Sequence, residues 1–106
     1  MTRQSLREKL LSTNLFIEND FFEQYLDLIS VENNSLKQGY TEKHHILPRA
    51  YYEHEHIPLD SSQANLIILT YADHCKAHYL MYFCTLDYLK NANAHAVHYI
   101  QKMFLW

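Results

Sequence analysis

Five polar side chains in the middle of the chain have the types and spacing that suit a metal-assisted reaction. They are His44 and His45, Asn65, and the pair His74 and His78. Residues four apart in a helix lie on one face, so His74 and His78 can both reach a single cation. Adjacent residues of an extended segment point to opposite sides, so His44 and His45 cannot easily both join them. One imidazole of that pair would complete a three-histidine metal site, and its neighbour would stay free as a general base.

An imidazole suits both tasks at neutral pH. The neutral ring is a common metal ligand. With an ordinary His pKa near 6.5, about three quarters of the side chains are unprotonated at pH 7 when they bind no metal. A base with that pKa is well matched to the activation of water. The alternative interpretation is that these histidines are solvated, or have hydrogen-bond partners in the core, and hold no ligand.

The same stretch resembles the HNH endonucleases, or ββα-metal nucleases, and most closely their short phage and mobile-intron members. The likeness lies in three motifs, EKHHILPR at 42–49, NLIILT at 65–70 and DHCKAHYL at 73–80. Either histidine pair alone would be a weak signal. Their order, with an Asn between them, makes the combination specific.

The resemblance implies a DNA endonuclease that hydrolyses phosphodiester bonds with the help of one divalent cation. The cation would be held by His44, His74 and His78. His45 would be the general base that removes a proton from the attacking water, and Asn65 would fix the loop between two strands. Imidazole ligands favour Zn, Ni, Co or Mn, whereas Mg prefers oxygen ligands, so the identity of the metal stays open among these five.

The charge balance fits a stand-alone nuclease poorly. The chain has 9 basic and 12 acidic residues, for a formal charge of −3, whereas DNA-binding domains are usually basic. We expect either positive charge concentrated around Lys43, Arg49 and Lys76, or affinity supplied by a homodimer, a protein partner or a segment beyond Trp106. Arg49 would hold a phosphate oxygen, or be an ordinary surface arginine.

Two other classes of function stay open. The first is an HNH-fold protein with weak or lost catalysis that binds a protein partner, as a phage counter-defence or regulatory factor would. The acidic balance favours this interpretation. The second is a structural zinc protein, in which a fourth protein ligand closes the metal site, whereas a catalytic site keeps a position open.

Length and composition indicate one globular domain. The chain has 106 residues, of which 48% are hydrophobic and 14% aromatic, enough for a modest core without disulfides. No apolar run approaches the roughly 20 residues of a membrane span, and no signal peptide opens the chain. We therefore expect no membrane association and a cytoplasmic protein of a bacterium or phage-infected cell. Cys75 and Cys84 would lie roughly 13 Å apart along one helix and stay reduced.

We expect an α+β fold that is mostly helical, in one HNH nuclease domain over residues 1–106. The ββα-metal core would span 40–84, and a C-terminal helix would span 91–106. Residues 1–30 would form two supporting helices, the first capped by Ser5 with Glu8 and the second by Asn19 or Asp20. The second helix carries a broad apolar stripe, which would pack against the core or form a dimer interface; its members are Phe21, Phe22, Tyr25, Leu26, Leu28 and Ile29.

Within the core we expect two strands, over 40–47 and 66–69, with the second covered on both faces because it is apolar throughout. Residues 50–63 would form a loop in which His54 and His56 are solvated. Thr70 with Asp73 would cap the helix of His74 and His78. That helix would continue to Leu89, with its inner side formed by Leu80, Met81, Phe83 and Leu86. His95 and His98, in the last helix, would be surface residues.

Overall fold

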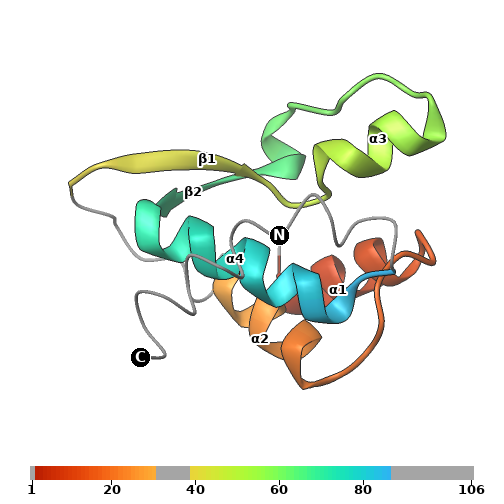
Figure 1. Ribbon diagram of the computed structural model, residues 1–106, viewed down its shortest axis with the longest axis horizontal. Helices are drawn as coiled ribbons and strands as arrows, with labels where there is room; N and C mark the ends of the chain where they lie inside the picture. The colour runs from red at the N-terminus through yellow and green to blue at the C-terminus, as the bar shows by residue number, and fades with distance from the viewer. Residues whose placement is uncertain (1, 31–38, 87–106) are drawn as a thin grey trace.

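The computed structural model describes residues 2–30 and 39–86 (Figure 1). Within these ranges the chain forms four α-helices and one two-stranded antiparallel sheet, which confirms the expected mostly helical α+β fold. The elements are α1 (Arg3–Leu11), α2 (Asp20–Ile29), β1 (Thr41–His45), α3 (Arg49–Glu55), β2 (Leu66–Thr70) and α4 (Tyr71–Cys84). The predicted C-terminal helix over 91–106, with His95 and His98, lies outside the described residues.

Helix α4 is the central element of the fold. It contacts both strands of the hairpin and also α2, and α1 in turn packs on α2 (Figure 1). The rings of Phe21 and Phe83, with centroids 4.8 Å apart, stack between α2 and α4. Most of the apolar stripe of α2 is therefore core in this chain, and its fully buried members are Phe22, Tyr25, Leu26 and Ile29.

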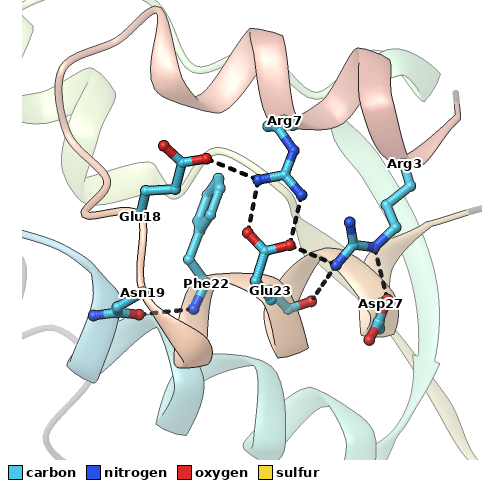
Figure 2. Close-up of polar contacts among 7 residues, drawn as sticks. All are labelled: Arg3, Arg7, Glu18, Asn19, Phe22, Glu23 and Asp27. Carbon is cyan, nitrogen blue, oxygen red and sulfur yellow. Dashed lines mark hydrogen bonds and ion pairs between the residues drawn. The ribbon is translucent and has the colours of Figure 1, made fainter.

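The caps of the first two helices follow the sequence only in part. The hydroxyl of Thr2 accepts a hydrogen bond from the Ser5 amide, so α1 begins earlier than predicted and the Ser5–Glu8 capping box is wrong. Ser5 lies inside the first turn, because the threonine three residues before it already satisfies its amide. The prediction for α2 is confirmed at Asn19, whose side chain accepts a hydrogen bond from the Phe22 amide at 2.9 Å (Figure 2).

Figure 2 also shows the ionic network that joins α1 to α2. The carboxylate of Glu23 accepts hydrogen bonds from the guanidinium groups of Arg3 and Arg7. Arg3 also binds Asp27 at 2.7 Å, and Arg7 binds Glu18 at 3.0 Å. The hydrogen bonds from Arg7 and then Arg3 lower the pKa of Glu23 to about 2.

The two strands pair with Lys43 opposite Ile68 and His44 opposite Ile67. Because side chains alternate along a strand, His44, Ile67 and Leu69 share the face toward α4, and Lys43 and Ile68 share the outer face. Ile68 is 51% exposed. The prediction that β2 is covered on both faces is therefore wrong, because the single helix α4 covers only one face of the hairpin.

Residues 50–63 are not the plain loop that we predicted. Helix α3 begins after Pro48, which has a φ of −74°, and ends at Glu55, before the capping residue His56, whose backbone is left-handed with a φ of 57°. The segment RAYYEHE has no Gly, Pro or β-branched residue, and it buries Tyr52 in the core. A 3₁₀ turn at Gln63–Asn65 then leads into β2.

Helix α4 begins as predicted and ends sooner. The Thr70 hydroxyl accepts a hydrogen bond from the Asp73 amide at 3.2 Å, which confirms the predicted cap. After α4 the chain turns extended, and Thr85 forms an isolated antiparallel bridge with Phe16. The prediction that this helix continues past Cys84 and places Leu86 on its inner side is therefore wrong. The Leu86 side chain is 41% exposed.

Three smaller expectations also have outcomes. Cys75 and Cys84 do not form a disulfide with each other, as their spacing predicted. His54 and His56 are both exposed. Among the described residues, no helix is long and apolar enough to cross a membrane.

Candidate metal centre

Three imidazoles meet between β1 and α4. His44 comes from the strand, and His74 and His78 come from the first two turns of the helix. The ring centroids of His44 lie 5.1 Å from those of both helical histidines, which lie 5.0 Å from each other. One ring nitrogen from each side chain lies within 4.8 Å of the others. The three histidines whose spacing predicted a metal site are therefore close enough to hold one ion.

Local structure explains the convergence. The Thr70 cap starts α4 so that His74 and His78, one helical turn apart, share a face. Their Nε2 atoms lie 3.2 Å from each other. Two nitrogens bound to one tetrahedral zinc at about 2.0–2.1 Å would lie about 3.3 Å apart. The observed separation is compatible with a shared cation.

His44 is the buried member of the group, with 1% of its surface exposed. Its Nε2 lies 2.8 Å from the hydroxyl of Tyr25, whereas its Nδ1 is buried and has no hydrogen-bond partner. Burial lowers the pKa of His44 well below its ordinary value, and the charges of the neighbouring imidazoles act in the same direction. A buried polar atom is nearly always satisfied in a native protein. His44 is thus a neutral imidazole whose Nδ1 has no hydrogen-bond partner and which lies beside the imidazoles of His74 and His78. These properties fit a metal ligand.

Glu42 forms an outer layer of the site beside His74. Its Oε1 lies 2.8 Å from Nδ1 of His74, and the Tyr40 hydroxyl donates to its other oxygen at 2.9 Å. The hydrogen bond with His74, and then that with Tyr40, lowers the pKa of Glu42. A carboxylate that accepts the Nδ1 hydrogen leaves Nε2 free for a metal, which is a common arrangement around metal-binding histidines.

His45 lies on the opposite face of β1 from His44, as predicted from the alternation of a strand. It is half-buried, and its Nε2 lies 3.2 Å from the hydroxyl oxygen of Ser61. Burial and then the charge of Arg49 lower the pKa of His45, and the charge of Asp60 opposes them. Both influences favour the neutral ring, which is the form that a general base requires.

Asn65 ties together the two ends of the segment between the strands. It is fully buried, and its Oδ1 accepts a hydrogen bond from the Leu47 amide at 2.8 Å. Its Nδ2 donates to the carbonyl oxygens of Leu47 at 3.2 Å and Asp60 at 2.8 Å. The backbone contacts expected of a loop-fixing Asn are therefore present, and they lie directly after the strand that carries His44 and His45.

The three basic residues predicted to bind substrate are exposed and lie on different elements. Lys43 lies on the outer face of β1 together with His45. Arg49, the first residue of α3, is close enough to His45 to lower its pKa. Lys76 lies between the two histidines of α4 in sequence, and so points away from their shared face. Lys43 and Arg49 thus lie on the side of the hairpin that carries His45, whereas Lys76 lies on α4.

Two residues of the site escaped the sequence reasoning. Glu42 could have been found, because residues two apart in a strand share a face and Glu42 precedes His44 by two. Tyr25 lies 19 residues before His44 and belongs to an apolar stripe with an ordinary core role. No local pattern in the sequence connects that tyrosine to a histidine of β1.

Comparison with known proteins assigns no family to this chain. No family model, no curated protein and no solved structure matches it. The chemical interpretation of the site therefore depends on the positions of its own side chains.

Proposed function

We propose that this chain is a metal-dependent endonuclease of the HNH, or ββα-metal, type that hydrolyses phosphodiester bonds in DNA. The observation that carries the proposal is the orphaned Nδ1 of buried His44 beside two imidazoles of α4, with His45 on the opposite face of the same strand. One divalent cation, Zn, Ni, Co, Mn or Mg, would be held by His44, His74 and His78. Two antiparallel strands followed by the helix with two of the ligands also match the arrangement expected of this family.

The number of ligands supports a catalytic site rather than a structural one. Among the described residues, the group that could hold an ion consists of three histidines, without a fourth His, Cys, Asp or Glu. Structural zinc sites use four protein ligands, whereas catalytic sites use three and keep a position for water or substrate. When bound, the cation would act as a Lewis acid that stabilises negative charge on the scissile phosphate and the leaving oxygen.

The other side chains have separate tasks in this proposal. His45 accepts a proton from the attacking water at Nε2, the nitrogen that the exposed Ser61 hydroxyl already reaches. Arg49 and Lys43, which lie on the same side of the hairpin as His45, bind nonbridging phosphate oxygens. Lys76 adds positive charge from α4. Asn65 holds the segment after β1 in place, so that the base keeps its position relative to the three ligands.

Plasmid cleavage tests the proposal. Metal-stripped protein is resupplied with Mg, Mn, Co, Ni or Zn and compared with the variants His45→Ala and His74→Ala. We expect cleavage only with metal. The loss of the general base in His45→Ala should reduce the rate roughly 10²- to 10⁴-fold while metal binding is retained. His74→Ala should lose both cleavage and metal binding, and His54→Ala, an exposed histidine of α3, should retain both.

Binding of a protein partner without cleavage is the competing function, and the formal charge of −3 favours it. Electrostatic attraction to phosphates supplies much of the affinity of DNA-binding proteins. Failure of the folded, metal-loaded wild type to cleave plasmid with any of the five metals would refute the nuclease proposal. The partner-binding role would then be the better explanation of the same three-histidine group.

A further inference from the structure

The hydroxyl group of Tyr25 connects the N-terminal helices to the three-histidine cluster of His44, His74 and His78. Tyr25 lies in α2 and is fully buried. Its oxygen lies 2.8 Å from Nε2 of His44 and 2.8 Å from the carbonyl oxygen of Ile46. The phenol therefore contacts the residues on both sides of His45: the candidate ligand His44 and Ile46, which follows β1.

These two contacts have only one consistent arrangement of hydrogens. The carbonyl oxygen of Ile46 can only accept, so the single hydroxyl hydrogen of Tyr25 is donated to it. The hydroxyl oxygen then offers only lone pairs to His44, whose Nε2 must carry a hydrogen. A second hydrogen on Nδ1 would be buried without an acceptor, which is costly. Neutral His44 is therefore the Nε2–H tautomer, with its lone pair on Nδ1.

We propose that Tyr25 is a positioning residue, which holds His44 in the tautomer that offers Nδ1 to a cation. This inference rests on the metal site of the proposed function and adds the atom and the partner that prepare it. The same reasoning applies to His74, whose Nδ1 hydrogen is donated to Glu42, so that its Nε2 lone pair lies on the side of His78, with the two Nε2 atoms 3.2 Å apart. The strand thus contributes a ligand through Nδ1 and the helix contributes one through Nε2, and each has its own hydrogen-bond partner.

Packing holds the phenol in this position. The Tyr25 ring meets the His44 ring edge-on, with centroids 5.9 Å apart and an interplanar angle of 83°. The ring of Phe16 also stacks on it, with centroids 6.0 Å apart. A ring enclosed in this way has few other rotamers, so the hydroxyl cannot turn away from the imidazole. The metal-ready form of His44 therefore requires α2 to be packed against the rest of the fold.

The tautomer can be read directly in the full chain without metal. Long-range ¹H–¹⁵N correlations within each imidazole of ¹⁵N-labelled protein distinguish the two tautomers, and through-bond correlations to the backbone assign His44. We expect the Nε2–H tautomer in the wild type. Tyr25→Phe, which removes only the hydroxyl, should give a mixture of tautomers and lower zinc affinity roughly 10- to 100-fold.

Tyr52→Phe is the matched control, because Tyr52 is also buried but lies in α3 with its ring against Tyr51. It should change neither the tautomer of His44 nor the affinity. The Nδ1–H tautomer in the wild type would overturn the inference, as would wild-type tautomer and affinity in Tyr25→Phe. The wild-type spectrum needs no variant, so it decides the matter even if Tyr25→Phe fails to fold. It is recorded without metal, so its outcome is separate from that of the cleavage assay.

Discussion

Glu42 and His74 are joined by a 2.8 Å contact between Oε1 and Nδ1, although 32 positions separate them in the sequence. The contact crosses from β1 to the first turn of α4. It orients the imidazole and, through the negative charge, makes its other nitrogen a better electron donor. Together with the contact between Tyr25 and His44, it gives His44 and His74 each a hydrogen-bond partner outside the three-histidine cluster.

Removal of the Glu42 charge should weaken metal binding. In Glu42→Gln the side chain keeps its length and an acceptor oxygen, but the imidazole of His74 loses its charged partner. We expect zinc affinity to fall by about tenfold, measured by competition with a chromophoric chelator. Glu55→Gln, an exposed carboxylate of α3, is the matched control and should bind zinc like the wild type. Equal affinity in the two variants would show that Glu42 has no influence on the site.

Zinc should stabilise the folded chain, because a preformed site exists only in the native state. At a free zinc concentration of 100 times the dissociation constant, the free energy of unfolding should rise by about 2.7 kcal/mol. Urea denaturation with and without zinc measures this increment. His78→Ala should lose most of it, and His54→Ala should keep it. An increment of the same size in His78→Ala would place the bound zinc elsewhere.

Asn65→Ala should destabilise the segment between the strands. The change removes three hydrogen bonds, two of them buried, and leaves the Leu47 amide, which now binds Oδ1, without an acceptor. We expect a loss of about 2–3 kcal/mol in the free energy of unfolding, measured by urea denaturation. Gln63→Ala, at an exposed position of the same turn, should change it by less than about 0.5 kcal/mol. A loss no larger than that of the control would mean that Asn65 does not hold the loop.

The stability contributed by Glu23 should depend on pH. Its pKa in the folded chain is about 2, below the ordinary value of 4.5, mainly because of hydrogen bonds from Arg7. This contribution is therefore fully present above pH 4.5 and is lost as the pH falls toward 2. Because 37% of the Glu23 side chain is exposed, solvent screening should limit it to about 1 kcal/mol.

The variant Glu23→Gln tests this expectation through urea denaturation at several pH values. It should be less stable than the wild type at pH 7, and the difference should shrink between pH 4.5 and 2. Glu8→Gln, on the exposed side of α1, should show little difference at any of these values. A difference for Glu23→Gln that is constant with pH would refute an ionic origin.

Features that depend on short-range periodicity could be predicted from the sequence. The spacing of His74 and His78 places them on one helical face, and the adjacency of His44 and His45 separates them across a strand. The caps at Asn19 and Thr70 follow from side chains that reach an amide three residues away.

Features that depend on competition between local and distant contacts could not be predicted from the sequence. Thr2 rather than Ser5 caps α1, and RAYYEHE forms a helix because Tyr52 can be buried. Helix α4 ends where the backbone of Cys84 and Leu86 bonds instead to the segment around Phe16. Each outcome is decided by which partner is available in the folded chain, and the local sequence does not contain that information.

The sequence by itself therefore determined which side chains could act and on which faces of their own elements they lie. The tertiary structure decided which partners prepare them. Tyr25 reaches His44 only because α2 packs against α4, and Glu42 reaches His74 only because α4 lies against β1. The physical reason is range: a period of two or of 3.6 residues is written into neighbouring positions, whereas a hydrogen bond between distant segments exists only after the chain has folded.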